Sequence, residues 1–270
     1  MTAFESNIQR LLQPLTEGLR VRHIAHFGLR VCSEEDRPDD VLARPELAEY
    51  DHIPIEGKSG IAKILERDSP KSKSGKSKPL DEGILVSADA PLATFIHAVR
   101  NQPYRLVVDG TQIKGIVTRS DLLKVPVLLL GYSLLAQLEL LANRAIEIKF
   151  KGSDDWLTEL KRLEAQHVEK EDRHAKRIEG RKKKAESENL SLPLVELADL
   201  VDKLRVIQDF LSSEGEFKTE LKEVVEFRNV VDHVRPLVPS RDGLEQFVQR
   251  LETVVGWITA IEQEIARRGG

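Results

Sequence analysis

The pattern of the sequence changes near residue 125, and this change restricts the fold more than any other feature. Before it, short apolar stretches such as Ile84-Leu-Val and Leu106-Val-Val alternate with helical patterns and turn residues, a mixture typical of α+β domains. From Pro126 onward no convincing strand occurs, and apolar residues recur at helical spacing. The sequence therefore predicts an α+β domain over residues 1–125, followed by an all-α helical bundle over residues 126–270. Both are ordinary domain sizes.

Five helical segments are expected in the second half, at about 127–150, 154–184, 194–211, 215–234 and 244–268. The second is strongly charged and is expected to be one long exposed helix. The first contains most of the chain's longest apolar run, Val125 to Ala136, which falls short of the ~20 apolar residues that a membrane span needs. Since no signal peptide is visible either, we expect a buried helix, no membrane partner and a cytoplasmic location.

The composition excludes several kinds of site and partner. Lys and Arg total 41 against 45 Asp and Glu, a net charge of −4 that argues against a protein coated by nucleic acid and permits a local basic patch. Aromatic residues make up only 5%, which disfavours modules that stack bases on exposed rings. Cys32 is the only cysteine, so a thiolate zinc cluster is excluded, and no group of Asp, Glu and His has metal-ligand spacing. We therefore expect no metal site.

The segment from Pro103 to Leu122 is expected to form a strand, a tight turn, a second strand and the start of a helix. Its turn, Asp109-Gly110, is the strongest hairpin signal in the chain. Thr118 stands at a helix cap position, beside free backbone N–H groups suited to an anion. Together with the helical pattern from Pro91 to Asn101, the ending Gly115-Ile-Val-Thr-Arg-Ser-Asp121 resembles a CBS domain.

In the CBS family two such repeats pair, and the cleft often binds AMP, ATP or another adenosyl ligand. The resemblance implies that Thr118 contacts phosphate and that Asp121 binds the ribose hydroxyls. Residues 49–68 resemble the end of a first repeat. Glu66 stands at the position of Thr118, and Ser69, directly after this segment, stands at that of Asp121. Because Glu66 would repel a phosphate, we expect at most one nucleotide site per chain. The other interpretation, a CBS pair that serves only as scaffold or dimer surface, stays open.

The most informative segment of the second half runs Glu226-Phe-Arg-Asn-Val-Val-Asp-His-Val-Arg-Pro236. On a helix, Asn229 and His233 share one face, and the long side chain of Arg228 spans the remaining gap. The imidazole can move a proton near neutral pH, and the guanidinium can hold two phosphate oxygens and stabilise a pentavalent transition state. These residues therefore suit cleavage of a phosphodiester without a metal, with Asn229 orienting either partner.

This segment resembles the signature of HEPN domains, helical bundles in which Arg-x4–6-His forms a ribonuclease site, often of toxin or defence type. The resemblance implies a homodimer whose two motifs face one cleft, and metal-independent RNA cleavage through the adjacent 2′-hydroxyl, leaving a 2′,3′-cyclic phosphate. Arg228, Asn229 and His233 would be the catalytic residues. The same spacing at Arg162 and His167 lacks a polar residue after the arginine, and we interpret that copy as accidental. A non-catalytic hydrogen-bond cluster stays the alternative for Arg228 and His233.

Two basic stretches differ in what they predict. Residues 69–80 are low in complexity, and their lysines indicate a solvated loop within the first domain rather than a binding site. The second stretch lies in the charged 154–184 segment and includes Arg181, Lys182, Lys183 and Lys184. These side chains suit contact with an RNA backbone, and a solvated helix end is the equal alternative.

The combined hypothesis is a metal-independent endoribonuclease that an adenine nucleotide regulates at the CBS-like domain. The alternative is a non-catalytic nucleotide-sensing protein whose helical half dimerises or binds a partner protein. Coupling between two sites needs a shared mechanical element. The apolar helix near 127–150 is the candidate, because it is joined directly to the Thr118–Asp121 helix start.

Overall fold

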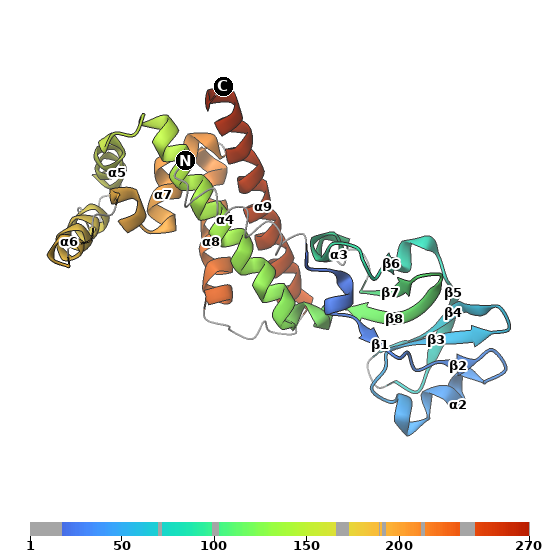
Figure 1. Cartoon of the computed structure of the whole chain (residues 1–270). Helices are drawn as coiled ribbons and strands as arrows, with labels where there is room; N and C mark the ends of the chain where they lie inside the picture. Colours follow the sequence, from blue (N-terminus) through green and yellow to red (C-terminus); the bar gives the residue numbers. More distant parts are fainter. Residues whose placement is uncertain are drawn as a thin grey trace. The chain divides into compact units, whose positions relative to one another are not determined.

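The computed structural model contains two compact units (Figure 1). The residues that it describes are 18–69, 72–98, 103–165, 173–188, 190, 193–211, 214–232 and 241–269. One unit spans Leu19–Pro126, and the other contains the described residues from Val127 onward. The first unit is α+β and the second is helical, which confirms the fold class predicted for each half.

The α+β unit contains two four-stranded sheets, and each is built on a repeat of strand, helix and hairpin (Figure 1). The strands are β1 (His26–Phe27), β2 (Cys32–Ser33), β3 (His52–Gly57), β4 (Gly60–Arg67), β5 (Gly75–Pro79), β6 (Leu85–Ser87), β7 (Tyr104–Asp109) and β8 (Gln112–Thr118). The helices are α2 (Pro38–Leu42), α3 (Leu92–Ala98) and the 3-10 helices η1 (Val21–His23), η2 (Pro45–Leu47), η3 (Glu82–Ile84) and η4 (Arg119–Leu123). The strand orders are β2-β3-β4-β5 and β1-β8-β7-β6.

The two repeats have the same internal register. Each begins with a parallel strand pair, β2 with β3 and β6 with β7, and continues with an antiparallel hairpin that a β-bulge interrupts at the corresponding position. At the open ends of the hairpins, His52 pairs with Glu66 and Tyr104 pairs with Thr118. This register places Glu66 at the position equivalent to Thr118, as the sequence repeat predicts.

Residues 75–79 form strand β5, so the prediction of a solvated loop over residues 69–80 is wrong for this part. The lysines and the serine of β5 are exposed, and the strand joins the sheet by pairing antiparallel with β4. Charged side chains are usual on an edge strand, where they discourage pairing with another chain. Sequence patterns detect strands by alternating apolar side chains, and a strand made of Gly, Lys, Ser and Pro has none.

Gly75 is required where β5 begins. A Cβ at this position would lie 2.3 Å from the main-chain carbonyl oxygen of Glu66 on β4. Because the paired backbone has no room to move aside, we expect Gly75→Ala to lower the free energy of unfolding by about 2 kcal/mol. Chemical denaturation measures this loss, with Ser77→Ala on the same strand as the control. Equal stability of the two variants would contradict the close approach.

The helical unit is formed by six α-helices and two 3-10 helices among its described residues. They are α4 (Val125–Lys149), α5 (Asp155–Ala165), α6 (Arg173–Ser187), η5 (Leu194–Leu197), α7 (Leu200–Val206), η6 (Gln208–Phe210), α8 (Glu214–Asp232) and α9 (Arg241–Gly269). Helices α8 and α9 pack against each other, and α7 contacts both α5 and α8 (Figure 1). The helices predicted at 127–150, 215–234 and 244–268 correspond to α4, α8 and α9.

Two of the expected helices differ from the structure. The single exposed helix predicted over 154–184 is described as α5 and α6, with residues 166–172 outside the described residues. Trp156 and Leu160 of α5 are buried, so this helix is not exposed throughout. The helix predicted over 194–211 is three short helices, η5, α7 and η6. Charge and apolar spacing predict helical residues well and the breaks between helices poorly.

Helix α4 is long and apolar enough to cross a membrane, by length and composition alone. Its mean hydropathy reaches 1.7 over 18 residues, and 50% of that window is buried. A core helix passes the same test, so this property does not overturn the expectation of a buried helix. The expectation of a buried helix holds for half of the window.

Candidate functional site

Thr118 and Asp121 meet at the end of β8. The main-chain N–H of Thr118 donates to Oδ2 of Asp121 at 2.7 Å, and the Thr118 hydroxyl donates to the same oxygen at 3.0 Å. The Thr118 hydroxyl also lies 2.7 Å from the hydroxyl of Ser120. The structure thus brings together the two residues that the sequence analysis assigns to a nucleotide.

The Asp121 carboxylate is buried, and two basic groups hold its other oxygen. Its side chain is 2% exposed, and Nζ of Lys124 and Nε2 of His26 each lie 2.9 Å from Oδ1. The Lys124 ammonium also donates to the carbonyl oxygen of Ile24. A ribose that reached Asp121 would have to share these partners or displace them.

The sequence analysis did not single out His26, whose ring contacts Asp121 in the structure. His26 reaches Asp121 because β1 pairs antiparallel with β8. A two-residue strand carries no sequence pattern that predicts such a pairing. No signal in the sequence would have found this contact.

In the first repeat, Glu66 links the two sheets. Its carboxylate accepts a hydrogen bond from the Tyr104 hydroxyl on β7 at 2.8 Å and forms an ion pair with Lys78 on β5. The ring of His52 lies against the Tyr104 ring, with 4.0 Å between centroids. The residue at the position of Thr118 therefore holds the repeats together instead of facing a phosphate.

The Glu66 link makes the stability of the α+β unit depend on pH. Burial raises the pKa of Glu66, but hydrogen bonds from Lys78 and Tyr104 outweigh it, so the pKa lies below its ordinary value of 4.5. A lowered pKa means that the stabilisation is present above pH 4.5 and is lost as the pH falls through the folded-state pKa. The pKa of Tyr104 is raised, mainly by burial of its hydroxyl and also by the hydrogen bond to Glu66.

We expect Tyr104→Phe to lower the free energy of unfolding by about 1 kcal/mol at pH 7, because it removes the hydrogen bond to Glu66. The variant should also lose less stability than the wild type between pH 5 and pH 3, since Glu66 then has one partner fewer. Urea denaturation across this range measures both effects, with exposed Tyr50→Phe as the control. The same pH profile for Tyr104→Phe and the wild type would contradict the link.

In the helical unit, Arg228 and Asn229 are half-buried in the C-terminal part of α8. The neighbouring Phe227 and Val231 are fully buried. A Cβ on Gly131 of α4 would lie 2.9 Å from Val231 and 3.2 Å from Phe227, so α4 approaches α8 closely at the turn that carries Arg228. A close-packed neighbour fixes the backbone from which Arg228 projects.

Helix α9 fixes the other side of α8. Nε1 of Trp257 donates to Glu220 at 2.9 Å, and Nε of Arg250 donates to Glu223 at 2.9 Å. These contacts join successive turns of α8 to α9. His233, the third residue of the motif, lies outside the described residues.

The second copy of the spacing has a different environment. Arg162 of α5 pairs with Glu159 on its own helix at 2.7 Å, and its side chain is 56% exposed. His167 lies outside the described residues. The exposed side chain of Arg162 thus pairs within its own helix.

The four basic residues assigned to RNA differ in their surroundings. Arg181 donates to the Asp199 carboxylate at 2.9 Å and to the carbonyl oxygen of Leu197 at 2.7 Å, so it points toward the start of α7. Lys182 lies 4.0 Å from Glu186 on its own helix. Lys183 and Lys184 are exposed.

Asp199, directly before α7, pairs with two arginines of α6. Arg177 of α6 lies 2.7 Å from its carboxylate. Partial burial raises the pKa of Asp199, but the Arg181 hydrogen bond and the charges of Arg177, Arg181 and Arg228 outweigh it, so the pKa is lowered. These arginines therefore favour the ionised form of Asp199.

The comparisons with known proteins bear on the end of the α+β unit. Residues 80–127 match the family model of the CBS domain. This match covers β6 to η4 and includes Thr118 and Asp121, which confirms the resemblance for the second repeat. A solved structure, the CBS domain of the bacterial CNNM/CorC family Mg2+ transporter in complex with ATP, is 18% identical, with a TM-score of 0.34. That alignment covers 46% of this chain and 96% of the other. No curated protein matches the chain.

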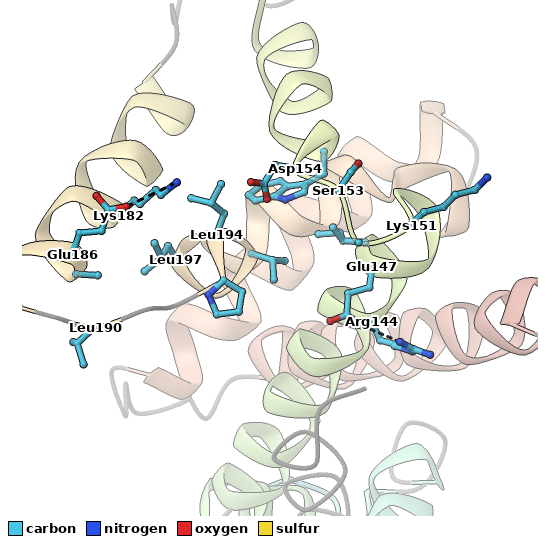
Figure 2. Close-up of a pocket in the computed structure, with 16 residues that line it drawn as sticks. Arg144, Glu147, Lys151, Ser153, Asp154, Lys182, Glu186, Leu190, Leu194 and Leu197 are labelled. Carbon is cyan, nitrogen blue, oxygen red and sulfur yellow. Dashed lines mark hydrogen bonds and ion pairs between the residues drawn. The ribbon is translucent and has the colours of Figure 1, made fainter.

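A pocket of about 870 Å³ lies in the helical unit, and its lining comes from the end of α4, the start of α5, α6 and η5 (Figure 2). Arg144 pairs with Glu147 in its wall at 2.9 Å, and Lys182 lies beside Glu186. Arg228 and Asn229 do not line it. Among the described residues, no group of three or more His, Cys, Asp or Glu side chains is placed to hold a metal ion.

Proposed function

We propose that the CBS domain binds an adenine nucleotide at Thr118 and Asp121. The observation that carries this proposal is that the family match over residues 80–127 contains the hydrogen-bonded pair of these two residues. The Thr118 hydroxyl would contact phosphate, and the Asp121 carboxylate would bind the ribose hydroxyls. Lys124 and His26, which hold the other oxygen of Asp121, would lie beside the ribose. Since Glu66 is bound to Tyr104 and Lys78, one site per chain is expected.

The proposed output of the helical unit is endonucleolytic RNA cleavage, and the motif of Arg228, Asn229 and His233 supports it. His233 would accept the proton of the 2′-hydroxyl, whose oxygen attacks phosphorus as the bond to the 5′-oxygen breaks and that oxygen takes up a proton. Arg228 would hold the phosphate oxygens and stabilise the transition-state charge, and Asn229 would orient either partner. The products are a 2′,3′-cyclic phosphate and a 5′-hydroxyl end.

A homodimer would place two motifs at one cleft, as in HEPN domains, and the protein would act on RNA in the cytoplasm without a metal cofactor.

The proposed coupling between the two units starts at Lys124. This residue, the partner of Asp121, is the single residue between η4 and α4. Nucleotide binding at Asp121 would therefore act at the first turn of α4, which is the proposed shared element.

The alternative is a non-catalytic nucleotide sensor whose helical unit dimerises or binds a partner protein. The observation in its favour is that the CBS match ends at residue 127 and leaves the helical unit unassigned. Incubation of the full chain with end-labelled RNA in EDTA separates the two functions. Cleavage supports the ribonuclease. No cleavage, with or without AMP or ATP, together with stabilisation by a nucleotide supports the sensor.

A further inference from the structure

The Asp121 carboxylate has a donor at each of its acceptor positions. A carboxylate offers about four lone-pair positions, two on each oxygen. Oδ2 accepts the main-chain N–H of Thr118 at 2.7 Å and the Thr118 hydroxyl at 3.0 Å. Oδ1 lies 2.9 Å from Nζ of Lys124 and 2.9 Å from Nε2 of His26, which donates when Nε2 carries the proton. The two hydroxyls of a ribose therefore find no open acceptor position on Asp121.

The four donors differ in how easily they can leave the carboxylate. Both bonds from Thr118 are local, because Thr118 and Asp121 form the capping box of η4. Breaking them requires a change in the backbone at the end of β8. The side chains of Lys124 and His26 are 34% and 64% exposed, so they can turn toward water by rotation alone. A ribose would therefore displace Lys124 and His26 rather than Thr118.

The route from solvent to Asp121 leads to the same two residues. The Asp121 side chain is only 2% exposed, whereas the imidazole against its Oδ1 is largely exposed. The Lys124 ammonium lies 3.2 Å from Nε2 of His26 and also donates to the carbonyl oxygen of Ile24. A ligand that approaches Oδ1 from solvent meets this linked pair of basic groups before it reaches the carboxylate.

We propose that His26 and Lys124 compete with the ribose for Asp121 and thereby set the nucleotide affinity of the CBS domain. The inference rests on the proposed nucleotide binding and deepens it, because it names the residues that regulate the same site. Ribose binding exchanges the two contacts at Oδ1 for hydrogen bonds from two hydroxyls, while the released ammonium and imidazole become hydrated. Because Lys124 directly precedes α4, its release acts on the residue at which the proposed coupling starts.

The test is calorimetric titration of the full chain with AMP and with ATP, each compared with its 2′,3′-dideoxy form, which lacks both ribose hydroxyls. Lys124→Met removes the ammonium and keeps most of the side chain, and His26→Ala removes the imidazole from an exposed position. Loss of one competing bond to a charged group changes an equilibrium constant roughly tenfold. We therefore expect each variant to bind AMP or ATP about tenfold more tightly than the wild type. The dideoxy forms should bind all three proteins equally, because they make no bond to Oδ1.

Matched controls lie on the same two strands. Lys114→Met removes the same charge from an exposed position on β8, and Phe27→Ala removes an exposed ring from β1 next to His26. Both should bind the nucleotides as the wild type does. Lys124→Met leaves a buried carboxylate without its cation, so it should also melt at a lower temperature in the absence of nucleotide. If that variant folds poorly, His26→Ala decides alone.

Three results would overturn the proposal. Weaker binding of both nucleotide forms to the Lys124 and His26 variants would mean that these groups attract phosphate instead of competing with the ribose. Unchanged affinity of both variants for AMP and ATP would mean that they do not compete. An equal gain with the dideoxy forms would mean that the ribose hydroxyls are not involved. Absence of nucleotide binding by the wild type and by both variants would instead refute the proposed nucleotide site itself.

Discussion

Replacing Arg228 or His233 by alanine should abolish RNA cleavage while leaving the fold intact. Loss of a positioned acid and base lowers kcat by about 10²–10⁴, and loss of a charged group that stabilises the transition state lowers it by about 10²–10³. Arg228 is half-buried on a helix that α4 and α9 hold from two sides, so its truncation should leave the melting temperature nearly unchanged. The measurement is single-turnover cleavage of an end-labelled RNA in EDTA.

The chain supplies its own matched control for this experiment. Arg162 stands in the same spacing to a histidine as Arg228, but its exposed side chain pairs with Glu159 on the same helix. Arg162→Ala should therefore cleave at the wild-type rate. Arg228→Lys should be intermediate at best, because an ammonium keeps the charge without the planar fork that holds two phosphate oxygens. Equal activity of Arg228→Ala and Arg162→Ala would exclude the assigned site.

The second large effect is expected at the CBS domain. A nucleotide present at about 100 times its Kd should stabilise the folded chain by about 2.7 kcal/mol. For a unit of this size, that corresponds to a rise in melting temperature on the order of 10 °C. Thr118→Val removes the hydroxyl assigned to the phosphate and keeps the side-chain volume. We expect it to remove most of the rise with AMP or ATP.

Thr118→Val is a cleaner test than a change at Asp121. The Asp121 carboxylate is buried against Lys124 and His26, and its removal would leave these groups without their partner, at a cost of a few kcal/mol before any ligand is added. Thr111→Val in the turn between β7 and β8 is the control, because this threonine is exposed and belongs to the same sheet. Equal rises in melting temperature for Thr118→Val and Thr111→Val would mean that the ligand binds elsewhere. No rise in the wild type would contradict nucleotide binding by the CBS domain.

Much of the fold follows from the sequence because its strongest signals are local. The Asp109-Gly110 turn and the helical apolar spacing of α8 and α9 need only neighbouring residues to be recognised. Strand β5 was missed because its lysines and serine contribute backbone pairing without an apolar face. The breaks around α7 were missed because apolar spacing continues across η5, α7 and η6.

The candidate sites show the same limit. Thr118 and Asp121 are three residues apart, and their hydrogen bonds are local, so the sequence could pair them. His26 joins them only through the pairing of β1 with β8, and Arg177 of α6 meets Asp199 only through tertiary packing. Contacts between residues distant in sequence depend on tertiary packing, which a local pattern does not encode.

The chemistry of the RNA ends tests the central claim most directly. Wild-type protein in EDTA should produce fragments that carry a 2′,3′-cyclic phosphate, with a 5′-hydroxyl on the following fragment, and mass spectrometry identifies both. An RNA with a single 2′-deoxy nucleotide at the cleavage position should stay intact there, because the attacking oxygen is missing. No product from the unmodified RNA, or equal cleavage of the 2′-deoxy strand, would contradict the account.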